Sequence, residues 1–329
     1  MTILRIRNKD GRSFCGHIIR RAALLMLGLA AAAAFHAGSM SVRAEKWRVS
    51  PYARVIWIGV DGVGTFFRDT DTPNFDRIFE TGKISWNVRA PEPTVSAPGW
   101  CSMFYGVDSS VHGITNDIAE STPFQSEQLK SVFRQTLDAY PGEKVGIFAT
   151  WYAIGYGMTD GGAKDTDLTV FPAGQKSAEP AQTLDAAVNW IQEQEDFKLL
   201  FFYLDNTDIA GHAYGYGAPG YLAEITRADE MIGTVYEALD EKGLLEDALI
   251  ILSTDHGGTP EGIHGGGSDA ETRCVFAARG SGLASPEERI GYMELKDIAA
   301  VVRYALGLEQ PDFSDAAVPE GLFAAMNQE

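Results

Sequence analysis

Three apolar runs in this 329-residue chain each lead into an acidic residue. Residues 55–60, 198–204 and 248–252 form the runs, and Asp61, Asp208 and Asp255 come shortly after them. Runs without polar alternation are typical of strands that are buried on both faces of a parallel sheet. The carboxyl ends of parallel strands meet at one edge of a sheet. The sequence therefore predicts an α/β fold with a doubly wound, mostly parallel central sheet, helices on both faces and the three acids at one edge.

Helical and strand patterns fill the stretches between these runs. Helices are predicted at 72–81, 125–139, 181–195, 219–242 and 294–306, and further strands at 144–150 and 273–278. The Gly- and Asp-rich segment 151–180 has no clear period. It either forms a small cap whose aromatic residues wall a substrate pocket, or packs on itself as a surface loop.

The first 44 residues have the composition of an export signal. Basic residues precede the apolar stretch 22–35, and Val42-Arg43-Ala44 is a plausible cleavage site. This stretch is shorter than the roughly 20 residues that span a bilayer, which disfavours a retained membrane anchor. We therefore expect a signal peptide at 1–44, a single catalytic domain at 45–329, a periplasmic or secreted location, and no stable membrane insertion once the signal is removed.

The remaining chain is strongly acidic. Seven of the 27 Lys and Arg residues but one of the 45 acids lie before residue 45, which leaves a formal charge of −24. The negative electrostatic field of such a protein disfavours a nucleic acid duplex as partner. It permits a small anionic substrate where metal ions neutralise the charge of the site. Cys101 and Cys274 either form one disulfide or stay as buried thiols. The sequence leaves the oligomeric state open.

Histidines cluster with the acids at the predicted sheet edge. His256 directly follows Asp255, and His264 lies in a glycine-rich loop eight residues later. Asp208 and His212 are four residues apart, so one helical turn presents both to the same side. Asp208, His212 and His264 would form one nitrogen and oxygen triad, and Asp61, Asp255 and His256 a second. Such sets suit two divalent metal ions, with zinc the expected metal.

Ser96 lies at the predicted N-terminus of a helix that runs to Gly106. Its hydroxyl group is either a plain helix cap or a nucleophile, because free amides and the helix dipole favour negative charge there. Asn116 follows in a turn-rich segment, from which its amide group could point at the site. His112, in the same segment, is interpreted as a structural hydrogen-bonding residue.

These motifs together resemble those of the alkaline phosphatase superfamily, within it the type I phosphodiesterase/nucleotide pyrophosphatase branch. The resemblance covers about residues 54–278 and rests on motifs in the family's order: Asp61, Pro93-Thr94-Val95-Ser96-Ala97-Pro98-Gly99-Trp100, His112-Gly113-Ile114, Asp208-x-x-Gly211-His212, Asp255-His256-Gly257 and His264-Gly265.

The resemblance implies a two-zinc hydrolase of small-molecule phosphate esters that acts through a phosphoseryl intermediate on Ser96. Asp208, His212 and His264 would hold one zinc, and Asp61, Asp255 and His256 would hold the other together with Ser96. Asn116 would donate to a phosphate oxygen. Trp100 replaces the Arg of the sulfatase motif, which argues against sulfate esters. A phosphodiesterase is the expected activity; the alternatives are a phosphomonoesterase, a phosphonate or sulfate-ester hydrolase, or an inactive extracytoplasmic binding protein.

Overall fold

The chain divides into two compact units, Met1–Val49 and Ser50–Glu329. The computed structural model describes residues 50–160, 167–171 and 177–324, all in the second unit. The signal peptide predicted at 1–44 lies outside these residues. Among the helices that the structure describes, none is long and apolar enough to cross a membrane.

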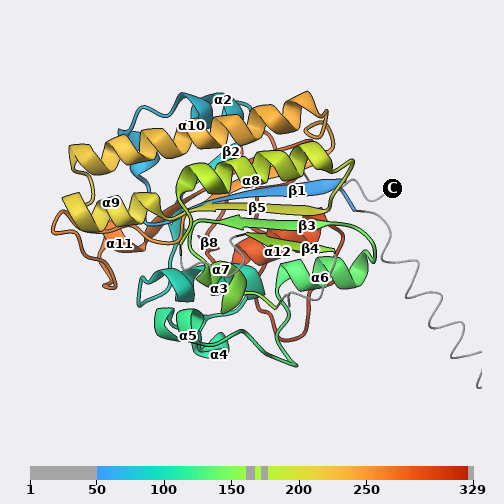
Figure 1. Cartoon of the computed structure of the whole chain (residues 1–329), viewed down its shortest axis with the longest axis horizontal. Coiled ribbons are helices and arrows are strands. Elements are labelled where there is room, and N and C mark those ends of the chain that lie inside the picture. The colour runs from blue at the N-terminus through green and yellow to red at the C-terminus, as the bar shows by residue number, and fades with distance from the viewer. Residues whose placement is uncertain (1–49, 161–166, 172–176, 325–329) are drawn as a thin grey trace, which may run out of the picture. The chain divides into compact units, whose positions relative to one another are not determined.

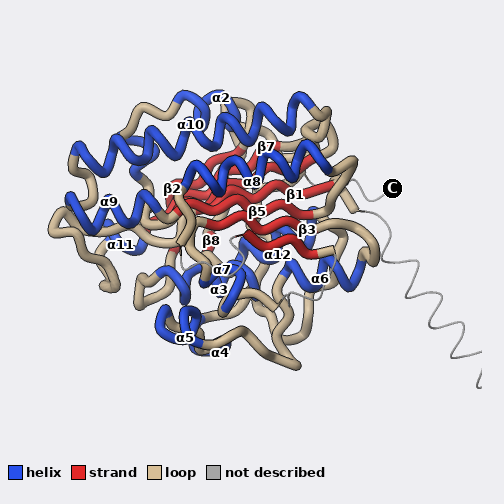
Figure 2. Tube along the Cα trace, in the orientation of Figure 1, coloured by secondary structure: helices blue, strands red, loops and turns tan. Residues whose placement is uncertain are grey.

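A sheet forms the centre of the second unit (Figure 2). It has eight strands, in the order β4-β3-β5-β1-β6-β7-β2-β8. β1 runs parallel to β5 and β6, whereas β7 is antiparallel to β6 and β2. The strands are β1 (Arg54–Val60), β2 (Lys83–Arg89), β3 (Val145–Ala149), β4 (Leu168–Phe171), β5 (Leu199–Leu204), β6 (Ala248–Ser253), β7 (Arg273–Arg279) and β8 (Met293–Glu294).

Helices cover both faces of the sheet (Figure 1). One face carries α2 (Pro73–Phe79), α8 (Pro180–Glu193) and α10 (Pro219–Glu241), and the other carries α3 (Ser96–Tyr105), α6 (Val132–Ala139) and α12 (Asp297–Ala305). Successive side chains of a strand point to opposite faces, so Trp57 enters the α3 core and Ile58 enters the α10 core. The predicted mostly parallel α/β sheet with helices on both faces is confirmed.

Two predicted helices begin later than the periodicity suggested. The helix expected at 125–139 is α6, which begins at Val132, because Ser126 accepts hydrogen bonds from the backbone of Gln128 and Leu129 and holds a turn there. The helix expected at 294–306 is α12, which begins at Asp297 because β8 occupies Met293–Glu294. Strand β2 was not predicted, since its polar and half-buried residues lack a clear period.

The segment 151–180 contributes to the central sheet. After the single turn α7 (Ala153–Tyr156), β4 pairs in parallel with β3 at the edge of the sheet. Residues 161–166 and 172–176 lie outside the described part. A cap formed by the rest of this segment stays a prediction.

Candidate metal centre and nucleophile

The candidate site lies where three adjacent parallel strands end. Asp61 follows β1, and Asp255 and His256 follow β6. Asp208 and His212 lie on α9 (Asn206–Tyr214), which begins directly beyond β5. Because β5, β1 and β6 are neighbours in the sheet, their carboxyl ends bring these residues together. The convergence expected from the sequence is therefore a property of the strand order.

Gly62 allows the turn after β1 to lie directly against Asp208 on α9. It has a positive φ of 68°, which side chains other than glycine rarely adopt. A Cβ atom at this position would also lie 2.4 Å from Oδ1 of Asp208. The glycine after Asp61 thus lets the backbone turn while the Asp208 carboxylate lies against it.

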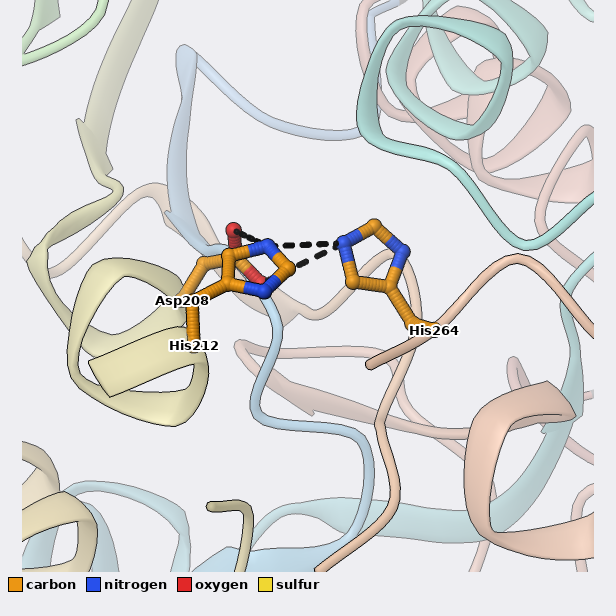
Figure 3. A group of neighbouring side chains, drawn as sticks. All are labelled: Asp208, His212 and His264. Atoms are coloured by element: carbon orange, nitrogen blue, oxygen red, sulfur yellow. Dashed lines mark hydrogen bonds and ion pairs between the residues drawn. The ribbon is translucent and has the colours of Figure 1, made fainter. Parts of the chain in front are cut away.

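Asp208, His212 and His264 form one compact group at the open side of the site (Figure 3). Nε2 of His212 lies 3.3 Å from Oδ2 of Asp208 and 3.1 Å from Nε2 of His264. Nε2 of His264 lies 3.9 Å from Oδ1 of Asp208. The His212 side chain is 48% exposed, whereas Asp208 is 14% exposed, so the group is open to solvent on the side of His212.

Backbone carbonyls fix the orientation of all three histidine rings. Nδ1 donates to a carbonyl oxygen in each case: His212 to Gly262 at 2.8 Å, His256 to Gly257 at 2.9 Å and His264 to Thr94 at 2.7 Å. A carbonyl oxygen can only accept, so Nδ1 carries a proton and Nε2 is left with its lone pair toward the site when the ring is neutral. This is the arrangement that metal-ligating histidines take.

The second group is buried and includes the candidate nucleophile. Ser96 is the first residue of α3, and its Oγ lies 3.2 Å from Oδ1 of Asp61 and 3.2 Å from Nε2 of His256. Nε2 of His256 lies 3.4 Å from both Asp61 Oδ1 and Asp255 Oδ2. Asp208 approaches this group as well, so that Asp61, Asp208 and His256 form a second set that can hold a metal ion. Asp208 therefore lies between the two groups.

Two hydrogen-bond donors contact Oδ2 of Asp61, the carboxylate oxygen that does not face Ser96. Trp100 Nε1 donates to Oδ2 at 2.8 Å, and the Tyr203 hydroxyl donates to the same atom at 2.5 Å. Burial raises the pKa of Asp61 well above its usual range, Asp255 and Asp208 raise it further, and these two hydrogen bonds lower it. In the sequence, Tyr203 lies in an apolar run and Trp100 in the nucleophile motif, and neither residue was assigned a hydrogen bond to Asp61. The signal that could have revealed Tyr203 is its hydroxyl at the end of an apolar run.

A third donor supports Asp208. The Tyr216 hydroxyl donates to its Oδ1 at 2.5 Å. Gly211 makes room for this ring, because a Cβ there would lie 2.4 Å from Tyr216 Cε1. Gly211 of the Asp208-x-x-Gly211-His212 motif thus makes room for Tyr216, which orients Asp208. Tyr216 was not identified from the sequence.

Asn116 and His112 lie beside the start and the second turn of α3. Asn116 begins α5 (Asn116–Ser121), and its side-chain oxygen accepts from the backbone N–H of Ala97 at 2.9 Å. His112 accepts at Nδ1 from the backbone of Ile114 at 3.0 Å, and its Nε2 lies 3.4 Å from Ser102 Oγ. His112 therefore belongs to the support of α3, as the sequence indicated, while Asn116 is next to Ser96.

The charges of the site call for a cation. Burial raises the pKa of Asp255 to about 6, and its Oδ2 has no hydrogen-bond partner. Among the described residues, no Lys or Arg hydrogen-bonds to or ion-pairs with the three carboxylates. In the absence of a metal, the hydrogen bond with Asp208 raises the pKa of His212 to about 9. The protonated ring then supplies the positive charge that a metal ion would otherwise supply. The donor set fits metal ions.

The two cysteines of the described part are free and buried. Cys101 lies on α3 and Cys274 on β7. Of the two states that the sequence left open, the structure has the buried thiols.

Comparisons with known proteins agree with this geometry. Residues 55–265 match the family model described as type I phosphodiesterase/nucleotide pyrophosphatase. Human ectonucleotide pyrophosphatase/phosphodiesterase family member 1 is 26% identical over 193 residues, 56% of this chain and 21% of that protein. GPI ethanolamine phosphate transferase 1 of Aspergillus oryzae is 24% identical over 268 residues, 70% of this chain and 25% of that protein.

The fold is shared with a solved structure from the same group of proteins. An inactive variant of murine ectonucleotide pyrophosphatase/phosphodiesterase 5 in complex with AMP superposes with a TM-score of 0.63 and 14% identity, covering 79% of this chain and 97% of that chain. The chain thus spans about a quarter of the length of the curated relatives it matches, but nearly all of this structure. From the matched residues and the shared fold, we conclude that the chain belongs to the type I phosphodiesterase/nucleotide pyrophosphatase family.

Proposed function

We propose that this protein hydrolyses phosphodiesters at a site that holds two divalent metal ions, with zinc the expected metal. The observation that carries the proposal is the orientation of His212, His256 and His264, whose Nδ1 atoms are all bound to backbone carbonyls. With Nδ1 bound in each ring, the three Nε2 atoms are directed at the carboxylates, which is the arrangement that holds cations. A metal ion bound there would take the place of the proton on His212.

The ligand sets follow from the two groups of side chains. Asp208, His212 and His264 would hold the more exposed ion, and Asp61, Asp255, His256 and Ser96 the buried one. When bound, such ions supply Lewis acidity and neutralise the negative charge of a phosphoryl group. The exposed edge at His212 leaves room for substrate beside the first ion.

Ser96 is the proposed nucleophile. Its Oγ lies between two acceptors, Asp61 Oδ1 and His256 Nε2, at the N-terminus of α3, where the helix dipole favours a developing negative charge. Attack by this oxygen on phosphorus would form a phosphoseryl bond and release the leaving alcohol. Water would then cleave that bond and regenerate the serine. The NH₂ group of Asn116, whose oxygen is bound to Ala97, would donate to a phosphate oxygen.

A diester is the better substrate for this charge distribution. A phosphomonoester carries about one more negative charge than a diester near neutral pH, and no Lys or Arg interacts with the three carboxylates in the described part. The AMP bound to the murine relative supports a nucleotide as one candidate substrate class. Phosphomonoesters, phosphonates and sulfate esters remain weaker alternatives, as does an inactive binding role.

Transfer to an alcohol is a second candidate, favoured by the match to a GPI ethanolamine phosphate transferase. The phosphoserine would be the same, and an acceptor hydroxyl would replace water in the second step. Product analysis in the presence of ethanol or glycerol separates transfer from hydrolysis. Transfer to the added alcohol gives a new phosphodiester, whereas hydrolysis gives a phosphomonoester.

Turnover of bis-p-nitrophenyl phosphate and p-nitrophenyl phosphate, with and without added zinc, tests the proposed activity. We expect a preference for the diester, a loss of at least about 1,000-fold in Ser96→Ala and partial activity in Ser96→Thr. Wild-type turnover by Ser96→Ala would refute the role of the serine. No turnover of either ester by zinc-loaded protein would refute the proposed activity.

We also propose that the protein is exported, on the strength of the basic and apolar composition of residues 1–44. Mass analysis of the protein from the periplasm of a bacterial host tests this. Cleavage near residue 44 is the expected result, and an intact N-terminus in the cytoplasmic fraction would contradict it.

A further inference from the structure

A second site of unusual charge lies along strand β2. A cavity of about 600 Å³ opens there, and none of its lining residues belongs to the candidate metal centre. Its charged residues are four cations and one acid, although the whole chain has 45 acids and 27 bases. The residues on which the argument rests are Arg68, Lys83, Trp86, Arg273, Glu288 and Arg289.

Arg68 is oriented by an aromatic ring and has donors to spare. Its guanidinium carbon lies 4.5 Å from the centroid of the Trp86 ring, and the side chain of Arg68 has no hydrogen bond or ion pair in the described part of the chain. Stacking uses the flat face of the guanidinium group and leaves its N–H edge available. A guanidinium held in this way suits two parallel hydrogen bonds to an oxyanion.

Lys83 also lines the cavity and joins strand β2 to the segment that carries Arg289. Its side chain is buried, and Nζ donates to the backbone carbonyls of Ser285, at 2.7 Å, and Glu288. These bonds tie the exposed segment that carries Arg289 to the sheet. Arg289, like Arg68, has no carboxylate partner among the residues that the structure describes. The buried Lys83 thus holds in place the segment that carries Arg289.

Arg273 completes the charged lining at the start of β7. Its ion pair with Asp269, at 2.8 Å, joins side chains that are 46% and 65% exposed. Exposed pairs of this kind contribute little and are readily replaced. The cavity therefore has a local excess of positive charge in a protein whose net charge is strongly negative.

We propose that this cavity binds a small oligo-anion, a molecule with two or more phosphate, carboxylate or sulfate groups, at a site separate from the metal centre. One oxyanion would pair with the edge of Arg68, and another with Arg289 or Arg273. A singly charged anion would satisfy one of these cations and leave the others unpaired, which favours ligands with several charges. This site stands independently of the proposed hydrolysis.

A fluorescent hydroxypyrene trisulfonate provides the probe, because sulfonates chelate metals poorly and its anisotropy reports binding to the full, metal-loaded protein. We expect saturable binding that weakens with salt. Arg68→Gln and Arg289→Gln should each lower the affinity about tenfold or more. Displacement by pyrophosphate or by citrate would identify the preferred oxyanion.

Arg77→Gln is the matched control. Arg77 also lies over an aromatic ring, Tyr236, at 5.2 Å, but it is paired with Glu237 at 2.9 Å. Its replacement should leave probe affinity unchanged. Arg68→Lys keeps the charge without the planar group and should still weaken binding.

Three outcomes would overturn the proposal. The first is equal probe affinity in wild type, Arg68→Gln and Arg289→Gln, all shown by circular dichroism to be folded. The second is wild-type affinity in Arg68→Lys, which would mean charge alone attracts the probe. The third is loss of diester turnover in Arg68→Gln, which would make the cavity part of the catalytic centre.

Discussion

The backbone carbonyl of Thr94 accepts a hydrogen bond from Nδ1 of His264 at 2.7 Å. The Thr94 hydroxyl also donates to the carbonyl of Gly266 at 2.8 Å and accepts from the N–H of Gly265 at 3.0 Å. One residue thus joins the loop that leads into Ser96 to the loop that carries His264. The position of a proposed metal ligand relative to the proposed nucleophile depends on this junction.

Thr94→Val should weaken metal binding at the more exposed group. It keeps the shape of the side chain but removes both hydroxyl contacts, so the His264 loop loses two of its bonds to the nucleophile loop. We expect about 10-fold weaker zinc affinity and a loss of about 1–3 kcal/mol in the free energy of unfolding. Zinc titration against a competing chelator measures the first. Thr94→Ser restores the hydroxyl and should behave as wild type; equal affinities in all three proteins would contradict the role.

Tyr203→Phe should impair turnover more than stability. The variant leaves Trp100 as the donor to Asp61 Oδ2, so the carboxylate beside Ser96 is less firmly oriented. A fall of about 10- to 100-fold in kcat or in metal affinity is expected. Tyr105→Phe is the control, because its buried hydroxyl donates to the Met158 carbonyl at 2.9 Å, outside the metal centre. Equal effects of the two variants on turnover would show that the Asp61 contact has no special role.

Metal removal should lower thermal stability as well as activity. Without cations the buried Asp61 and Asp255 repel each other, and Asp255 Oδ2 has no partner. Ligand binding at about 1,000 times Kd stabilises a fold by about 4 kcal/mol, so EDTA should lower the melting temperature and zinc should restore it. EDTA presaturated with calcium is the control for nonspecific effects. An unchanged melting temperature after verified metal removal would show that bound metal does not stabilise the fold.

His112 should make the fold sensitive to mild acid. Burial lowers its pKa to about 4, and the N–H of Ile114 donates to its Nδ1, which requires an unprotonated nitrogen there. The unfolded chain takes up a proton near pH 6.5, so this contribution to stability is complete above that pH and is lost as the pH falls toward 4. The expected loss is about 1–3 kcal/mol.

Urea unfolding of wild type and His112→Gln between pH 4 and 7 measures this dependence. The glutamine variant has no group at this position that titrates, so it should not lose the stability that the wild type loses through His112 as the pH falls. The difference in the free energy of unfolding between the two proteins should therefore shrink or reverse. A difference that stays constant over this range would contradict the assignment.

The sequence by itself determined the class of fold, and it predicted the acids and histidines that the structure brings together at the candidate site. The apolar runs before Asp61, Asp208 and Asp255 specify strands buried on both faces, and this burial requires helices on both sides of the sheet. The spacing of Asp208 and His212 on one helix turn is also a local property, which is why both were found without tertiary information.

The tertiary structure decided what surrounds those residues. Strand order β5-β1-β6 brings three distant segments to one point, and no local pattern encodes which strands are neighbours. Tyr203, Tyr216 and Thr94 act through hydrogen bonds to residues 8 to 172 positions away, so their sequence neighbourhoods show only an apolar strand and two loops. Orientation of the site is thus a long-range property, because hydrogen bonds depend on where two atoms meet in space and not on their separation along the chain.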